Sequence, residues 1–478
     1  MSTLSAPREG AAPAALPHTA RMTPFDYLRV HGDRFVHELA AFVRYPSVSA
    51  QADRTADLRR CAKWLAQHLG AIGLERVREA GTTGPPVVRA EWRHAPGRPT
   101  LLVYGHYDVQ PPDPLNEWSS PPFEPAVRGE HLYGRGVADD KGQMFVHVKA
   151  IEGYLKTTGS LPINVQCLFE GEEEIGSPHL AAFIEHEGRA LAADVAVVSD
   201  MRILGPTRPA LTESLRGALT LELTVRGQEE ELHSGNFGGA VHNPLQALCE
   251  ILTRLHDARG RVAIPGFYDR VRELSSDDRA YMSAVGPTNA QILSDAGATR
   301  GWGEPGYSLY ERTTIRPSLT ITAIIGGYQG PGAKAVIPAR ASARLNFRLA
   351  ADQDPAEIEL LFRRFVARIA PPSVAVSVRT QFGAHPVATS RDHPAMRAAA
   401  IAYRGGFGQP PVFVRVGGTV PVVHLLQRLL NVPSVMMGFA LPDSNLHAPN
   451  ERLHLPTFFR GIRSSIRFLA ELARGGRS

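Results

Sequence analysis

The sequence contains few cysteines. Cys61, Cys167 and Cys249 are too few and too far apart to form a disulfide framework or a C-x-x-C zinc site. We interpret all three as buried, reduced thiols, which is typical of a cytoplasmic protein. The chain is therefore not expected to be a disulfide-rich secreted protein.

Long hydrophobic runs and dense basic clusters are also missing. No apolar run reaches the ~18 to 20 residues that span a bilayer, so we expect no membrane segment. Residues 1–22 are rich in alanine and proline and lack the apolar core of a secretory signal, which indicates a mobile N-terminal tail. The net charge is +5, but the basic residues are spread along the chain, so we expect no nucleic-acid partner.

The composition is that of a globular protein, and the length indicates more than one hydrophobic core. The chain has 478 residues, of which 43% are hydrophobic and 21% are charged. This length exceeds that of one ordinary domain, so we expect two or more domains.

Residues 24–212 alternate helical and strand patterns. This alternation predicts an α/β fold with a doubly wound, mostly parallel sheet. The expected helices are 25–44, 55–72 and 141–154, and the expected strands are 86–92, 100–105, 163–169 and 193–199. The alternation resumes after about residue 385, with helices at 393–404, 420–430 and 456–474 and strands at 412–416 and 433–439.

The pattern changes at about residue 214. Residues 217–225 alternate like a half-exposed strand, and the following elements complete the order β-α-β-β-α-β of a ferredoxin-like unit. These elements are a helix at 242–257, strands at 318–326 and 341–349, a helix at 354–370 and a strand at 373–382. We therefore predict a smaller α+β domain, residues 214–384 with an insertion at about 258–317. It interrupts a larger domain made of residues 23–213 and 385–478.

Acidic residues and histidines follow the buried strands of the larger domain. His106 ends one such strand, and Asp108 stands where its carboxylate can orient the imidazole for a metal. Because the carboxyl ends of strands form the ligand crevice of an open α/β sheet, residues at several strand ends can converge. One histidine at a strand end is a weak signal, and three further clusters strengthen it.

The first two clusters are acidic. Asp139 and Asp140 precede the helix expected from residue 141; we interpret Asp139 as a metal ligand, whereas Asp140 could be a ligand or an N-cap. The glutamates of residues 170–174 follow a buried strand. Such a run is usually a solvated surface, but like charges crowded at a strand end would be costly without a cation. Adjacent glutamates can also divide the work between metal and proton.

The third cluster is Asp200 and the loop around His447, each after a buried strand. Mixed histidine and carboxylate ligands suit zinc, manganese or cobalt better than calcium. Two divalent cations would bring four positive charges against three carboxylates, and the remainder would acidify a bridging water near neutral pH. The ligands expected for such a pair are His106, Asp139, Glu174, Asp200 and His447.

Together these motifs resemble those of the di-zinc exopeptidase family that includes carnosinases, cytosolic dipeptidases, aminoacylases and glutamate carboxypeptidases. The resemblance covers nearly the whole chain after residue 24. It implies two divalent metal ions, zinc first, with manganese or cobalt as alternatives. The implied ligands are His106 and Asp200 for one ion and Glu174 and His447 for the other, with Asp139 bridging.

The resemblance also implies roles around the metals. Asp108 would orient His106, Glu173 would be the general base, and a cis peptide would follow Asp139. His233, in the smaller domain, would polarise the substrate carbonyl, often in the partner subunit's active site. A homodimer formed through a lid and dimerisation domain is therefore implied.

Further implied residues bind the substrate. Arg348 would contact the substrate carboxylate, and Gly418 and Thr419 belong to a turn that binds the same group. Three departures from the family pattern blur the substrate assignment without removing a ligand. Glu231 stands where an aspartate is more usual, Val416 stands where carnosinases tend to have glutamate, and Thr419 replaces a serine.

The favoured hypothesis is a cytoplasmic, metal-dependent dipeptidase that cleaves small unblocked peptides. Aspartate at the position of Asp200 tends to mark aminopeptidase-like and dipeptidase members of the family, and the insertion at 258–317 resembles that of the cytosolic dipeptidases. The alternative of the same family is an N-acyl-amino-acid amidohydrolase or carboxypeptidase. Two further alternatives come from other classes. Loss of Glu173 or of a metal ligand would have supported a non-catalytic binding protein, but every position is filled. A carboxylate-only glycosidase would not need His106 and His447.

Overall fold

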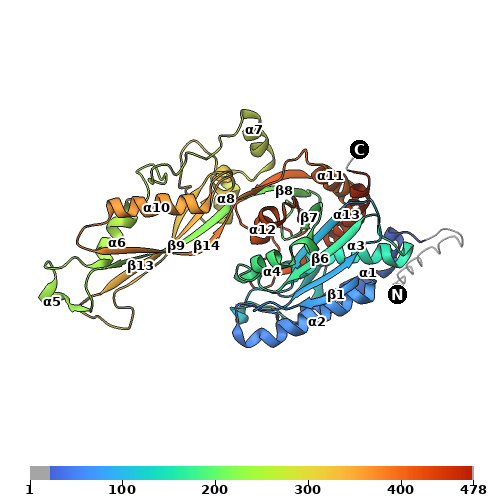
Figure 1. Cartoon of the computed structure of the whole chain (residues 1–478), viewed down its shortest axis with the longest axis horizontal. Coiled ribbons are helices and arrows are strands. Elements are labelled where there is room, and N and C mark those ends of the chain that lie inside the picture. The colour runs from blue at the N-terminus through green and yellow to red at the C-terminus, as the bar shows by residue number, and fades with distance from the viewer. Residues whose placement is uncertain (1–21, 476–478) are drawn as a thin grey trace, which may run out of the picture.

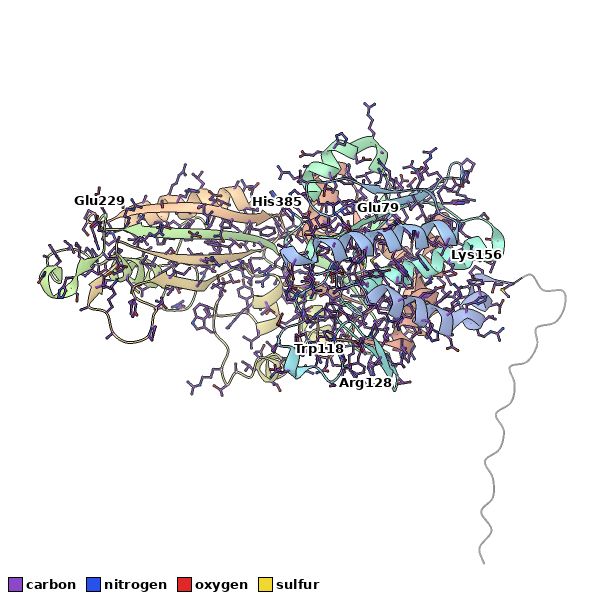
Figure 2. All side chains as sticks on the ribbon, turned by 90° about the horizontal axis from the view of Figure 1, so that it is seen from below. Glu79, Trp118, Arg128, Lys156, Glu229 and His385 are labelled. Carbon is purple, nitrogen blue, oxygen red and sulfur yellow. The ribbon has the colours of Figure 1, made fainter. Side chains whose placement is uncertain are left out.

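The computed structural model describes residues 22–475, so the tail predicted for residues 1–22 lies outside this part of the chain, apart from Met22. Figure 1 shows an elongated molecule with a large α/β lobe at one end and a smaller lobe at the other. Figure 2 shows Glu229 towards the far end of the smaller lobe, His385 where the lobes join, and Lys156 in the larger lobe. Within residues 22–475, no helix is both long enough and apolar enough to cross a bilayer.

The larger lobe contains a sheet in the order β1-β2-β6-β3-β7-β17-β8-β15, with β16 beside β8. These strands are β1 (Glu75–Ala80), β2 (Val87–Trp92), β3 (Thr100–His106), β6 (Asn164–Glu170), β7 (Val195–Val198), β8 (Ala210–Leu215), β15 (Val387–Ala388), β16 (Val412–Val416) and β17 (Ser434–Met437). The central strands β6, β3, β7 and β17 pair in parallel, whereas β1, β2 and β15 pair antiparallel at the margins. The predicted α/β class with a mainly parallel central sheet is confirmed.

Both faces of this sheet are buried, which explains the continuous apolar runs of its central strands. In β3, Leu101 and Val103 belong to one core cluster, while Leu102 and Tyr104 belong to another. The first cluster is covered by α1 (Pro24–Val43), α2 (Thr55–Ile72), α3 (Lys141–Thr158), α11 (Pro394–Phe407) and α13 (Leu455–Ala473). The second is covered by α4 (Leu180–Glu187) and α12 (Pro421–Leu430).

The smaller lobe is an antiparallel sheet in the order β11-β13-β9-β14. Its elements are β9 (Gly217–Arg226), α6 (Pro244–Thr253), β11 (Ser318–Gly326), β13 (Arg340–Leu349), α10 (Pro355–Ile369) and β14 (Ala375–Ala384). Alternate residues of β9 are buried against α6 and α10 in a core of their own. The predicted ferredoxin-like order is confirmed.

The insertion contains α7 (Ser276–Val285), α8 (Asn289–Asp295) and α9 (Leu309–Thr314). Two of its tyrosines hold the edge strand β16 of the large sheet. Phe413 N–H donates to Tyr281 Oη (2.8 Å), and Arg415 N–H donates to Tyr310 Oη (3.1 Å). The insertion therefore bridges the lobes, although it lies in sequence inside the smaller one.

Several elements have no counterpart in the sequence prediction. Strand β1 is an exposed, charged edge strand, and β8 contains Glu213, so neither shows an apolar pattern. The other unpredicted elements are α4, β4 (Ala126–Arg128), β5 (His131–Tyr133), β10 (Leu232–His233), α5 (Ser234–Phe237), β12 (Val336–Ile337), β15 and β18 (Arg452–His454). Among the cysteines, Cys61 and Cys167 are buried as predicted, but the prediction was wrong for Cys249, which is exposed on α6.

Candidate active site

Four parallel neighbouring strands end at the same edge of the large sheet. His106 and Glu170 are paired at the ends of β3 and β6, and Asp200 follows β7. His447 lies in the loop after β17. Topology thus brings together side chains that are more than 300 residues apart in sequence, as expected for the carboxyl edge of a parallel sheet.

His106 is fully buried and held by the segment that follows it. Its Nδ1 lies 3.1 Å from the carbonyl oxygen of Asp108 and 3.4 Å from Asp108 Oδ1. Its Nε2 points towards Asp139 Oδ1 at 3.4 Å and has no hydrogen-bond partner. A buried imidazole nitrogen without a partner, oriented through its other nitrogen, fits a metal ligand.

Asp108 also anchors the acidic turn. Its two carboxylate oxygens accept the N–H groups of Glu173 (3.2 Å) and Glu174 (3.1 Å). These glutamates begin the 3₁₀ turn Glu173–Ile175 that follows β6. One buried carboxylate therefore links the segment of His106 to the glutamate run.

Asp139 lies between the two histidines. Its Oδ1 is 3.4 Å from His106 Nε2, and its Oδ2 is 2.9 Å from His447 Nε2. The peptide bond between Asp139 and Asp140 is cis, in agreement with the prediction. This is the position in which one carboxylate can serve two metal ions.

Asp140 stands at the N-cap position of α3, but its side chain does not cap the helix. Its Oδ2 instead accepts the backbone N–H of His106 (3.3 Å). Gly105 permits this approach, because a Cβ there would lie 2.5 Å from Met144 Cβ and 3.0 Å from Asp140 Oδ2. The interpretation of Asp140 as an N-cap is therefore wrong, because its side chain does not cap the helix. It stabilises the strand that carries His106 instead.

The remaining carboxylates crowd around the histidines. Glu174 Oε2 lies 3.3 Å from His447 Nε2 and accepts Gln110 Nε2 (2.9 Å), while its Oε1 has no partner. Burial and the nearby charge of Asp139 raise the pKa of Asp200 to about 7. Burial raises the pKa of Glu173 well above its ordinary value, and the charges of Asp200 and Glu174 add to the shift. Such repulsion would be relieved by a divalent cation.

Two three-residue groups have ligand atoms that all lie within 4.8 Å of one another. They are His106, Glu173 and Asp200, and His106, Asp139 and Glu174. His447 adjoins the second group through Asp139 and Glu174. The predicted metal residues are thus assembled in one place, and the predicted base Glu173 lies among them.

A third such group, Glu38, His68 and Glu152, lies among the helices of the larger lobe. The ammonium group of Lys149 already occupies it, with Nζ 2.5 Å from Glu38, 2.8 Å from His68 and 2.7 Å from Glu152. This group needs no metal for charge balance.

Glu451 is a supporting residue that the sequence did not reveal. It is fully buried and accepts Arg135 Nη1 (2.9 Å) and the backbone N–H groups of Gly136 (2.9 Å), Ala138 (2.9 Å) and Asp139 (3.0 Å). It therefore fixes the loop that presents Asp139. In sequence it is one polar residue of the His447 loop, and its distant partner Arg135 carries no signal that would pair them.

The predicted substrate residues meet where the lobes join. Arg348 Nη1 donates to Thr419 Oγ1 (2.9 Å), whose hydroxyl donates to the carbonyl of Arg216 (2.7 Å). Gly418 and Thr419 line a cavity of about 610 Å³ that also reaches Asp200. The turn predicted to bind a carboxylate is therefore open to the same space as Asp200.

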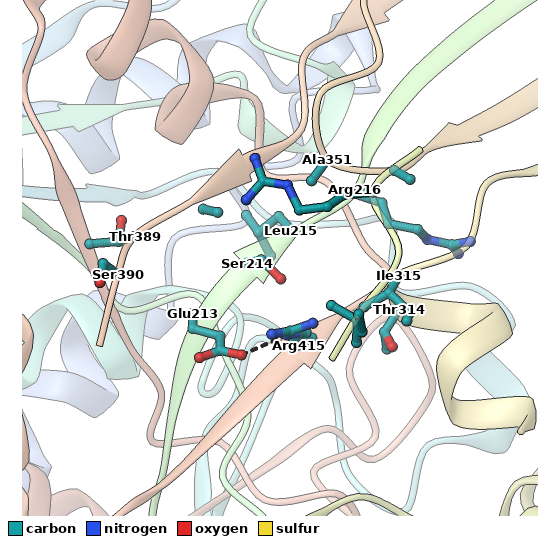
Figure 3. A pocket seen from close by; sticks show the side chains of 14 residues that line it. Glu213, Ser214, Leu215, Arg216, Thr314, Ile315, Ala351, Thr389, Ser390 and Arg415 are labelled. Atoms are coloured by element: carbon teal, nitrogen blue, oxygen red, sulfur yellow. Dashed lines mark hydrogen bonds and ion pairs between the residues drawn. The ribbon is translucent and has the colours of Figure 1, made fainter. Parts of the chain in front are cut away.

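Arg216, which no sequence pattern indicates, supports this turn. Its guanidinium donates to the carbonyls of Gly417 (3.2 Å) and Arg316 (3.1 Å). Figure 3 shows Arg216 near Leu215 and Ala351, with which it lines a neighbouring pocket. Burial and the neighbouring charge of Arg348 lower the pKa of Arg216 to about 9.

His233 is not brought to this site by its own chain. It is exposed on the short strand β10, and its Nδ1 accepts the N–H of Gly235 (3.0 Å). The adjoining α5 lies at the far end of the smaller lobe in Figure 1. Within one chain this imidazole therefore lies apart from the metal residues.

Comparison with known proteins identifies the family. The model described as peptidase family M20/M25/M40 matches residues 102–471. The chain belongs to this family. The predicted family and the prediction of a peptidase enzyme are thereby confirmed.

Three similar proteins cover nearly the whole chain. The "Cys-Gly metallodipeptidase dug1" of Schizosaccharomyces pombe is 31% identical over 92% of this chain and 96% of the relative. The "Beta-Ala-His dipeptidase" of Homo sapiens is 28% identical over 94% of this chain and 92% of the relative. A solved structure, "a M20 family metallo-carboxypeptidase Sso-CP2 from Sulfolobus solfataricus", is 30% identical with a TM-score of 0.84, covering 92% of this chain and 100% of the other.

Proposed function

We propose that this chain is a metal-dependent dipeptidase that cleaves the amide bond of small unblocked peptides. The observation that carries the proposal is the cluster of His106, Asp139, Glu174, Asp200 and His447 beside a cavity that Gly418 and Thr419 line. The names of the fungal and human relatives, both dipeptidases, support the substrate class.

The residues present fit two divalent ions. We assign His106 and Asp200 to one ion, Glu174 and His447 to the other, and Asp139 to both; the partnerless His106 Nε2 and Glu174 Oε1 support this assignment. Zinc suits the mixed nitrogen and oxygen donors, with manganese and cobalt as alternatives. When bound, such ions lower the pKa of water and polarise the amide carbonyl.

Glu173 is assigned the proton transfers. Its partly buried carboxylate, which lies in one group with His106 and Asp200, can take a proton from the attacking water and return it to the leaving amine. Asp108 holds its backbone in place through the Glu173 N–H. Arg348, Gly418 and Thr419 are assigned to the substrate carboxylate, which orients the amide bond towards Glu173.

We further propose that residues 214–384 form a lid and dimerisation domain. Its edge strand β11 exposes Ile321 (37%), Ile324 (51%) and Ile325 (49%), which a second copy could cover. A homodimer would allow His233 of one subunit to polarise the substrate carbonyl in the other. We also propose a cytoplasmic location, which the free, buried thiols of Cys61 and Cys167 support.

The test is hydrolysis of free dipeptides by metal-stripped protein with and without added zinc, manganese or cobalt. We expect no turnover in the stripped protein and restored turnover on adding metal, in parallel with about two bound ions per chain. Metal binding without cleavage of any dipeptide would contradict the proposal.

The alternative function is an N-acyl-amino-acid amidohydrolase or carboxypeptidase. It is favoured by the likeness to the metallo-carboxypeptidase, whose structure superposes with a TM-score of 0.84. A dipeptide and its N-acetylated form separate the two functions: the dipeptidase requires the free amine, and the alternative cleaves the acetylated form at least as well.

A further inference from the structure

The cavity beside the metal residues has a mainly apolar lining. It extends from Asp200 to Gly418 and Thr419 and has a volume of about 610 Å³. Its apolar side chains come from the ends of several strands and from the loops that follow them. They include Met201, Leu215, Val414, Val416, Val420 and Leu446.

The charged groups of this cavity are exposed or neutralised, apart from Asp200. Arg202, Arg208 and Asp295 line it but are exposed to solvent. Arg415 turns to Glu213, with Nε 2.6 Å from Oε1, and Figure 3 shows this ion pair. Apart from Asp200, which we assign to a metal ion, these lining residues thus offer a charged side chain no buried partner of opposite charge.

The insertion closes one side of the cavity. Val285 and Pro287, at the end of α7, line it, and Arg208 Nη2 donates to the carbonyl of Val285 (2.9 Å). The hydroxyls of Tyr281 and Tyr310 hold the insertion on β16, the strand that carries Val414 and Val416. The apolar walls therefore come from both lobes and are fixed to each other.

We propose that this cavity holds the side chain of the C-terminal residue of a dipeptide and selects large apolar side chains. The inference rests on the proposed dipeptidase function. A substrate whose amide lies at the metals and whose carboxylate lies at Gly418 and Thr419 places its C-terminal residue between them. The side chain of that residue then has the apolar cavity beside it.

The test uses the full metal-loaded protein and two dipeptide series, Gly-X and X-Gly, where X is Ala, Leu, Phe, Lys or Glu. We expect kcat/KM for Gly-Leu and Gly-Phe to exceed that for Gly-Ala by about 10- to 200-fold, with Gly-Lys and Gly-Glu no better than Gly-Ala. The X-Gly series should vary less.

Two variants locate the preference in the cavity. Val416→Thr, which keeps the volume and adds a hydroxyl, should reduce the Gly-Leu to Gly-Ala ratio about three- to tenfold. Val412→Thr is the matched control, because Val412 lies on the same strand but outside the cavity, and should leave the ratio unchanged.

The outcomes separate the two proposals. Cleavage of Gly-X dipeptides with no apolar preference, with a preference for Lys or Glu, or with selection only in the X-Gly series overturns the cavity assignment. An unchanged ratio in Val416→Thr also overturns it. Cleavage of no dipeptide at all overturns the dipeptidase function itself.

Discussion

Glu173 lies in a three-residue group with His106 and Asp200, so its carboxylate is close enough to act as a proton acceptor or as a ligand. Replacing the carboxylate by the amide of glutamine distinguishes the proton acceptor from the metal ligand. Glutamine keeps the shape of the side chain but cannot accept the proton. If Glu173 is a metal ligand, in contrast, the same substitution would weaken metal binding.

We expect Glu173→Gln to reduce kcat by about 10²- to 10⁴-fold while metal content stays at the wild-type value. The measurements are dipeptide turnover and metal analysis of the same sample. Glu172→Gln is the control, since Glu172 adjoins Glu173 in sequence but its carboxylate pairs with His179 (2.8 Å). A parallel loss of one metal ion would instead make Glu173 a ligand.

Glu451 illustrates a different kind of residue effect, on stability. Its fully buried carboxylate accepts hydrogen bonds from the Arg135 guanidinium and from three backbone N–H groups. We expect Glu451→Gln to destabilise the larger lobe by about 3 to 5 kcal/mol, because the Arg135 charge would be left buried without its partner.

The measurement for Glu451→Gln is the denaturation midpoint of the metal-free protein. Glu130→Gln, at a side chain that is 74% exposed, should leave the midpoint unchanged. A midpoint equal to that of the wild type in Glu451→Gln would show that the loop does not depend on this ion pair.

At the scale of elements, His147 links α3 to α13 and to the segment after β7. It lies on α3, and its ring contacts Ser465 on α13 (2.9 Å) and Ser199 after β7 (2.6 Å). Burial lowers its pKa to about 3 from the ordinary 6.5. The unfolded chain therefore binds a proton below pH 6.5 that the folded protein does not bind. Stability from this group is present above pH 6.5 and is lost as the pH falls towards 3.

We expect lowering the pH from 6.5 to 5 to destabilise the wild type by about 2 kcal/mol more than His147→Gln. The measurement is denaturation of metal-free protein at both pH values. His94→Gln, at a side chain that is 57% exposed, is the control and should behave like the wild type. Equal pH dependence in His147→Gln and the wild type would contradict the assignment.

At the scale of the whole molecule, the distance between His233 and the metal residues is the main question. Helix α5 lies at the far end of the smaller lobe (Figure 1), whereas His106 and Glu170 lie at the edge of the sheet in the larger lobe. In the proposed homodimer, His233 of one copy acts in the site of the other, and a mixed dimer can test this proposal directly.

We expect His233→Ala and Glu173→Gln to be inactive alone but active when the two chains are co-expressed. One mixed dimer has one site with an intact Glu173 and the partner's intact His233, so a random mixture should recover about a quarter of wild-type activity. Each variant co-expressed with itself is the control. Mixed dimers without recovered activity would place His233 outside the partner's site.

Sequence patterns alone determined much of this protein. The apolar runs ending in His106, Glu170 and Asp200 predicted both the strands and the edge at which they meet, because parallel strands present their carboxyl ends together. The alternation in residues 217–225 predicted a one-sided sheet. These features depend on local periodicity and on a few topological rules.

Only the tertiary structure decided the supporting contacts. The partners Glu451 and Arg135, Arg216 and Gly417, and Tyr281 and Phe413 are far apart in sequence. Single polar residues have no periodicity, so nothing in the chain pairs them before it folds. For the same reason the apolar cavity, with walls from both lobes and the insertion, became visible only when its segments were assembled.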